Sequence, residues 1–378
     1  MKKILLILFF LASGYNLTYA QFDNSSIENR IRPDSSRTGD VYLNIYNFNF
    51  VRDYEYANQF HDGYTLYGTQ LQPTLVYYAH PNLAIVAGAY LRQDYGNNGL
   101  RDAKPIFTLK YHKKDLTLNF GSIEGGIQHG YIEQLWDFER QITEPIQYGT
   151  QFLVEKKRFK LDAWIAWQKQ IYTPSPVKEQ IVGGLTSEGT IFDTNGWKLS
   201  IPLQFLAFHK GGQIDTLKQI PIQTLVNGAT GFKLHKQVGG SIKEVYTDNY
   251  IAVFKDFSPE KRLAFQGGFG VWLNGGVDTK FGNIQASYWR GNNFITMKGM
   301  PLYESVSSTL FDNGHIENKR SIFLLRYNYQ KELLPHLYLD TRIEPHWDLG
   351  TSRKENLQFQ GSFFLTYKQD FKLFKAKK

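Results

Sequence analysis

The chain has nine histidines, and they are the first residues to test for chemistry because histidine is the most frequent general acid or base in enzymes. None stands beside a serine on a strand-like segment, where an esterase could pair them. Neither an HExxH zinc motif nor a glycine loop for phosphate is present. His315, in the segment Asp312–His315, is interpreted as a solvated loop residue. We therefore expect a protein without catalytic residues, metal or cofactor, that is, not an enzyme. The histidines are His61, His80, His112, His129, His209, His235, His315, His336 and His346.

Charged residues recur at every second position near the C-terminus, and we expect them to share one face of a strand. They are Asp340, Arg342, Glu344 and His346, with Arg326 one strand earlier. Opposed charges that line a pore select permeating solutes by charge. The same charges can instead form a cross-strand network that only fills and stiffens the interior. Both interpretations stay open.

A second group mixes aromatic and charged side chains in one loop. It comprises Glu133, Trp136, Asp137, Glu139 and Arg140. Such a loop can stack on a sugar ring, or it can form a constricting segment inside a barrel. An ordinary loop that packs its own aromatic side chains is the simplest interpretation.

The elements that must position these groups are β-strands, because apolar and polar residues alternate along most of the chain. Alternation is regular in residues 83–91, 116–121, 161–168, 263–274, 337–347 and 357–368. The intervening turns are short at 80–82, 113–115 and 157–159. They are long at 94–102, 174–189 and 298–320. Short turns that alternate with long polar loops are typical of outer-membrane barrels.

We count about 14 strands from residue 41 onward, with 12 and 16 as neighbouring options, because bacterial barrels have even strand numbers. The stretch 197–255 can be divided in more than one way. No linker or repeat separates two domains. The predicted fold is therefore all-β, a single antiparallel transmembrane β-barrel over residues 41–378.

The first 20 residues predict export. Two lysines precede the apolar run 4–11, which is too short to span a bilayer as a helix. The segment ends at Ala20 in a signal-peptidase pattern. Residues 1–20 are thus expected to be a signal peptide, and the polar residues 21–40 a flexible periplasmic leader. Since the chain has no cysteine, a lipoprotein anchor and disulfides are both excluded.

Composition excludes other classes of protein. The net charge of +8 is mild and scattered, so nucleic-acid binding is not expected. Mean hydropathy is −0.39, and beyond residue 20 no run approaches the length of a membrane helix. Aromatic residues make up 16% of the chain and gather at expected strand ends, as in the girdles of membrane barrels. The polar opposite faces fit a wet lumen better than the packed second layer of a sandwich.

These features together resemble the uncharacterised porin-like outer-membrane barrels of Bacteroidetes bacteria. Similarity is also carried by the segment 125–140 (GGIQHGYIEQLWDFER), which leads to an expected strand at 148–155. The resemblance implies a bacterial outer-membrane protein and brings no known substrate.

Three functions remain in consideration. The leading one is a porin-like channel for passive passage of small hydrophilic solutes, because a barrel of about 14 strands can enclose an aqueous lumen. The alternative is a plugged structural or interaction barrel whose long loops bind a partner or glycan. The second alternative is an outer-membrane hydrolase. Outer-membrane lipid and a small solute are the expected partners, and oligomerisation is left open.

Overall fold

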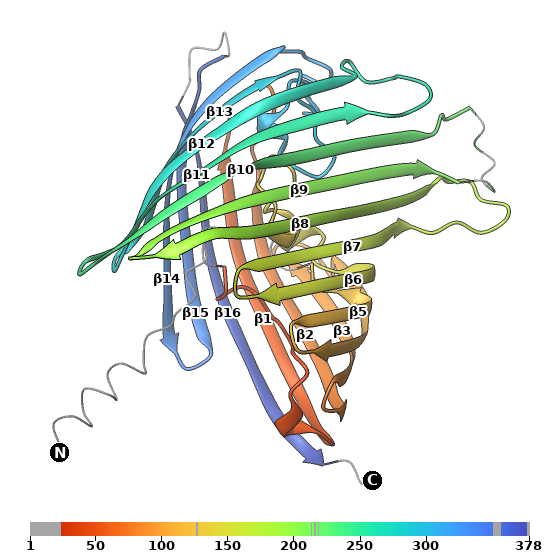
Figure 1. Ribbon diagram of the computed structural model, residues 1–378. Helices are drawn as coiled ribbons and strands as arrows, with labels where there is room; N and C mark the ends of the chain where they lie inside the picture. The colour runs from red at the N-terminus through yellow and green to blue at the C-terminus, as the bar shows by residue number, and fades with distance from the viewer. Residues whose placement is uncertain are drawn as a thin grey trace.

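Sixteen antiparallel strands close into one barrel in the computed structural model, with β1 pairing to both β2 and β16 (Figure 1). The structure describes residues 24–125, 128–212, 214, 217, 219–350 and 357–375. The predicted signal peptide, residues 1–20, lies outside these ranges. Every neighbouring pair in the sheet is also adjacent in sequence, apart from the closing pair. The predicted all-β transmembrane-type barrel is thereby confirmed.

The strand bounds are β1 Asp40–Glu55, β2 Thr65–His80, β3 Leu83–Asp94, β4 Asp102–Lys113, β5 Leu116–Ile123, β6 Gln147–Lys156, β7 Phe159–Lys169, β8 Glu179–Thr194, β9 Trp197–Gly211, β10 Gln223–Gly239, β11 Ile242–Asp256, β12 Gly267–Thr279, β13 Gly282–Asn292, β14 Lys319–Leu334, β15 Leu337–Asp348 and β16 Leu357–Lys375. The helices among the described residues are short, and they lie before β1 or in connecting segments. They are η1 Ser35–Arg37, η2 Gln128–Gly130, α2 Arg140–Thr143 and η3 Pro301–Tyr303. Among the described residues, no helix is long and apolar enough to cross a membrane.

The count is 16 strands rather than about 14, for two reasons. Residues 174–189, expected to be a loop, are mostly strand, because β8 begins at Glu179 and its Gly, Ser and Thr residues hide the alternation. The stretch 197–255 forms three strands joined by turns as short as two residues, so each strand uses less chain than estimated.

The two ends of the barrel differ in the length of their connections. The end at which β1 begins and β16 ends has seven two-residue turns, as at Asn195–Gly196, where φ is 50° and 74°. Asn-Gly suits a two-residue hairpin because both residues tolerate positive φ. The other end has the long segments. In outer-membrane barrels the short turns are periplasmic and the long loops extracellular, so β1 runs from the periplasmic end to the extracellular end.

The outer surface of the wall is apolar and exposed, whereas the inner surface is polar and buried. Outward side chains include Leu75, Phe107, Leu203, Ile251 and Phe363, each between 45% and 56% exposed. Inward positions alternate with them and carry residues such as Gln70, Asn119 and Thr366. An apolar belt around a closed sheet is what a bilayer requires.

The lumen is filled by chain as well as by side chains. Residues 24–39, part of the predicted flexible leader, lie inside the periplasmic half of the barrel. Ile27 is fully buried there, and its carbonyl oxygen accepts a hydrogen bond of 2.7 Å from the Tyr46 hydroxyl. From the extracellular end, the segments 124–146 and 293–318 fold inward. Most of their buried apolar residues join one hydrophobic cluster with the wall residues Trp164, Trp272 and Trp289. Phe138 and Ile142 join a second cluster instead.

Candidate functional site

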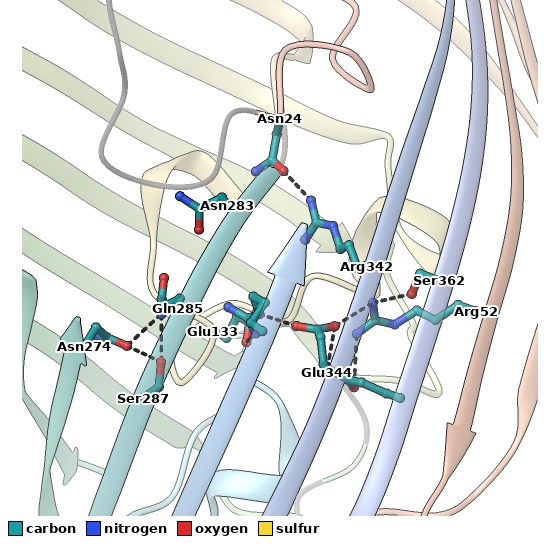
Figure 2. A network of polar contacts seen from close by, with 12 residues as sticks. Asn24, Arg52, Glu133, Asn274, Asn283, Gln285, Ser287, Arg342, Glu344 and Ser362 are labelled. Atoms are coloured by element: carbon teal, nitrogen blue, oxygen red, sulfur yellow. Dashed lines mark hydrogen bonds and ion pairs between the residues drawn. The ribbon is translucent and has the colours of Figure 1, made fainter. Parts of the chain in front are cut away.

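All five residues singled out near the C-terminus project into the lumen from β14 and β15. Figure 2 shows two of them, Arg342 and Glu344. Even-numbered residues of both strands face inward, because odd-numbered neighbours such as Leu325 and Ile343 face outward. The five residues are at most 4% exposed. Arg326, Asp340, Arg342, Glu344 and His346 therefore share one inner wall.

Arg326 joins this wall to the inward-folded segment 124–146. Its Nη2 donates a hydrogen bond of 2.6 Å to Glu133 Oε2, and its Nε donates to Glu344 Oε1. Glu344 Oε2 also accepts from Gln360 Nε2 at 2.7 Å and lies 3.9 Å from Arg52 Nη1. The loop group and the strand group, proposed separately from the sequence, thus meet in a buried ionic network through Glu133, Arg326 and Glu344.

Arg342 pairs with Asp340 nearer the periplasmic end of the same wall. It donates to Asn24 Oδ1, and its guanidinium lies 3.8 Å from the ring centroid of Phe138. Asp340 accepts from Arg342 Nε at 3.5 Å and from Ser26 Oγ at 3.3 Å. The N-terminal segment is therefore held by the same wall that holds segment 124–146.

His346 lies apart from these ion pairs. Neither ring nitrogen has a hydrogen-bond partner among the described residues. Its ring meets Tyr56 edge-on, with the two centroids 4.8 Å apart. Of the five wall residues, His346 is the one that the ionic network leaves out.

The remaining loop residues fasten segment 124–146 to other loops. Arg140 Nε donates to the carbonyl oxygen of Lys298 at 2.8 Å, and Glu139 Oε2 accepts from the Tyr64 hydroxyl at 2.6 Å. Trp136 packs edge-on against Trp164, with the ring centroids 5.5 Å apart. The two inward segments consequently support each other.

Opposite walls of the barrel hold segment 124–146 between them. On one side, Gln70 Nε2 and Arg92 Nη1 each donate at 2.9 Å to the carbonyl oxygen of Ile142. On the other side, the Tyr131 hydroxyl donates to the carbonyl oxygen of Phe205 on β9 at 2.8 Å. Because β2 and β9 lie far apart around the ring, the segment crosses the lumen. Trp136 also stacks on Tyr131 of the same segment, with the ring centroids 6.1 Å apart, so the segment packs its own aromatic side chains as well.

Asp137, in segment 124–146, has a raised pKa. Burial, and next the nearby carboxylate of Glu139, raise the pKa of Asp137 to about 7. The Asp137 carboxylate accepts a hydrogen bond of 2.9 Å from the backbone N–H of Glu139. The crossing segment therefore carries a group that changes charge near neutral pH.

One pair with acid–base chemistry lies in the lumen and escaped the sequence search. His129 Nδ1 is 3.0 Å from Asp162 Oδ2, and the His129 ring stacks on Trp164 with the centroids 4.3 Å apart. Gln151 Nε2 donates to both oxygens of Asp162, at 2.9 and 3.1 Å. The pair lines a cavity of about 390 Å³. No motif could reveal it, since 33 residues separate its members and only the folded loop brings them together.

Polar side chains also lie on the outer, lipid-facing surface, over the extracellular half of β1–β3. We call this set the outer polar patch. Thr65 donates to the Asp53 carboxylate, and Asn47 Nδ2 donates to Thr69 Oγ1 at 2.9 Å. Asn49 stands opposite Thr69 in the ladder. The patch comprises Asn47, Asn49, Asp53, Thr65, Thr69 and Gln93.

The patch begins near the middle of β1, between apolar outward residues, and it has more members than the outward pair Thr247 and Asn249 on β11, in which Asn249 Nδ2 donates to Thr247 Oγ1 at 2.8 Å. A polar group that faces hydrocarbon is costly, so polar positions in a membrane-facing wall tend to be functional. A second outward pair, His209 Nδ1 and Thr224 Oγ1 at 2.9 Å, lies only at the extracellular ends of β9 and β10. There, polar residues meet headgroups and are common. The patch is therefore the stronger candidate for a lipid-directed site.

No set of three or more histidine, aspartate or glutamate side chains within the described ranges is placed to hold a metal ion.

Comparison with solved structures finds bacterial outer-membrane proteins. The protein OprD of Pseudomonas aeruginosa aligns with a TM-score of 0.51 and 12% identity, covering 90% of this chain and 96% of that one. OpdK of the same organism gives 0.48 and 10%, with 88% and 100% covered. A loop-deletion form of OmpT of Vibrio cholerae gives 0.49 and 11%, with 87% and 98% covered. A search of curated protein sequences finds no match.

The family comparison overturns one expectation from the sequence. The model of the lipid A 3'-O-deacylase-type family matches residues 31–376. The prediction that the protein is not an enzyme is therefore wrong, since this family is named for an enzymatic reaction. The motif search failed because it looked for residues close in sequence, whereas a barrel assembles its polar groups across strands. With the match spanning nearly all of the barrel, the chain belongs to the lipid A 3'-O-deacylase-type family.

Proposed function

We propose that this protein hydrolyses an acyl ester of lipid A in the outer leaflet, and that the reaction takes place at the outer polar patch. The observation that carries the proposal is the Asp53–Thr65 pair, which faces lipid at the extracellular end of β1 and β2. A lipid ester reaches the outer wall by lateral diffusion. Polar groups on the outer wall can contact the ester while the lipid stays in the membrane.

The chemistry assigned to the pair is general-base hydrolysis. The Asp53 carboxylate accepts a proton from a water molecule, and the water oxygen attacks the ester carbonyl. The bond to the sugar oxygen then breaks, the sugar oxygen takes up a proton, and a free fatty acid is released. Thr65 is assigned a positioning role, because its hydroxyl holds the carboxylate through a hydrogen bond.

The filled lumen supports a reaction on the outside. Segment 124–146 crosses the barrel, and the side chain of His129 is 0% exposed behind the wall. The His129–Asp162 pair has the groups of an acid–base catalyst, but its cavity lies inside the barrel and is lined by charged side chains such as Lys233 and Glu188. An acyl chain would have to leave the membrane to reach it.

The test is mass spectrometry of lipid A after incubation with the purified, refolded protein in mixed micelles. We expect loss of one acyl chain from the 3' position, and a fall of roughly 100-fold or more in rate for Asp53→Asn. Thr65→Val should lower the rate less. Matched controls are Glu179→Gln, an outward carboxylate at the extracellular end of β8, and Thr341→Val, an outward threonine on β15.

Two outcomes would count against the proposal. If His129→Gln abolishes acyl release while Asp53→Asn leaves it unchanged, the reaction occurs in the lumen rather than at the patch. If the folded protein releases no acyl chain under any condition, ester hydrolysis itself is wrong. A gel shift between boiled and unboiled samples verifies that each variant has folded.

Passage of small hydrophilic solutes is the second candidate function. It is favoured by the polar inner wall and by a periplasmic cavity of about 1000 Å³, which shares Ser25, Glu28, Arg30 and Arg32 with the cavity beside His129. Planar-bilayer recording tests it. Steady conductance from the full chain supports passage. Conductance that appears only after deletion of residues 128–143 would mean that segment 124–146 closes the barrel.

A further inference from the structure

The periplasmic end of β16 has a neighbour on one side only. On the β1 side, pairing continues down to Asp40 opposite Lys375. On the β15 side, pairing stops at Leu337 opposite Tyr367, and the last contact is the hydrogen bond of 3.1 Å from Lys368 N–H to the carbonyl oxygen of His336. On the side away from β1, residues 369–375 therefore have no strand partner among the described residues. We call these residues the free edge.

The free edge projects below the β14–β15 turn (Figure 1). Seven residues at about 3.3 Å each give it a length of roughly 23 Å. Its other border is firm, because β1 and β2 continue the sheet beside it. A strand that is fixed on one side and open on the other presents a row of backbone donors and acceptors for pairing.

The side chains of the free edge are exposed as well. Phe371, Leu373 and Phe374 are 40%, 47% and 57% exposed. Bare backbone groups and apolar side chains are together what strand addition uses, since main-chain hydrogen bonds give affinity and alternate side chains give specificity.

Charge indicates what kind of segment fits. The stretch from Lys368 to the C-terminus contains five lysines and one acid, Asp370. Arg37 Nη1 already contacts Asp370 at 2.7 Å, and Lys372 already contacts Asp40 at 2.7 Å. The net charge of this stretch is therefore positive. It attracts an acidic strand more strongly than a neutral or a basic one.

We propose that the free edge is a docking site for an extended, acidic segment of a periplasmic protein, which adds to the barrel as a further strand beside β16. This site lies at the opposite end of the barrel from the outer polar patch, so it is independent of the proposed hydrolysis. It would tie the enzyme to a soluble partner beneath the membrane.

The first test is amide hydrogen exchange on the full-length barrel in detergent. Without a partner, we expect some amides of residues 369–375 to exchange at least tenfold faster than those of residues 359–366, which pair on both sides. If all amides of both stretches are equally protected, the protein itself covers the edge and the proposal is overturned.

The second test adds a probe, an eight-residue peptide of alternating glutamate and valine. We expect slower exchange in residues 369–375, and a dissociation constant at least tenfold higher for Lys375→Glu. The matched control is Lys157→Glu, in the periplasmic turn between β6 and β7, which should leave binding unchanged. Equal protection by a lysine–valine peptide, or none by either peptide, would refute an acidic partner.

Discussion

Replacing Arg326 with methionine tests whether the inner wall holds the crossing segment through its ion pairs. Arg326, Glu133 and Glu344 are 4%, 10% and 1% exposed at their side chains, so all three charges are shielded from water. Removing one member of a buried ion pair typically lowers the free energy of unfolding by about 3–5 kcal/mol, because a charge is left without compensation. We expect Arg326→Met to fall in that range.

The two carboxylates should contribute unequally to this loss. Glu344 keeps Gln360 at 2.7 Å and Arg52 at 3.9 Å, whereas the side chain of Glu133 has Arg326 as its one recorded ionic partner among the described residues. Most of the cost therefore comes from Glu133. Neutralising it in the double variant Arg326→Met/Glu133→Gln should recover roughly 1–3 kcal/mol of stability, the usual size of coupling between contacting residues.

The assay is urea unfolding in detergent micelles, followed by tryptophan fluorescence. Arg290→Met is the matched control, since Arg290 faces outward on β13 and its change should stay within about 0.5 kcal/mol. If the double variant is as unstable as Arg326→Met alone, the loss does not come from a stranded Glu133 carboxylate, and the ionic argument fails.

Three further predictions concern the crossing segment and the patch. Burial raises the pKa of Asp137, so the ionisation of this carboxyl above neutral pH opposes folding. Asp137→Asn should therefore increase the free energy of unfolding at pH 8 by at most about 4 kcal/mol, since each pKa unit corresponds to about 1.4 kcal/mol. At pH 3 the substitution should change nothing, and urea titrations at the two pH values measure both effects. Gly184→Ala places a Cβ 2.0 Å from the Tyr131 hydroxyl, so tryptic cleavage at Arg140 in the folded barrel should become faster; unchanged cleavage would mean that Tyr131 moves aside freely. Asn47→Leu should shift the free energy of unfolding by no more than about 1 kcal/mol yet lower acyl release, and full activity would remove Asn47 from the site.

The sequence was sufficient for the fold class because alternation of apolar and polar residues has a direct physical cause, a wall with lipid outside and water or polar groups inside. It placed Arg326, Asp340, Arg342, Glu344 and His346 on one face, and all five do lie in the lumen. The strand number was underestimated where Gly, Ser and Thr residues in β8 obscure the alternation. Small residues carry little hydrophobic signal on either face.

The candidate site was beyond the reach of the sequence because its contacts cross strands. Asp53 and Thr65 are 12 residues apart, and they meet only through the register of β1 and β2. His129 finds Asp162 only because segment 124–146 turns inward. The search for histidine–serine spacing therefore gave the wrong conclusion about enzymatic function.

The amino-acid sequence by itself determined that this chain forms a closed antiparallel wall and which residues face each side, because the two-residue period of a strand is local and repeats. Only the tertiary structure decided which segments fill the interior of the barrel. Glu133 and Arg326 are 193 residues apart and meet 2.6 Å from each other in the lumen. Contacts of that range depend on strand register and loop direction, which barrel closure fixes and no local pattern encodes.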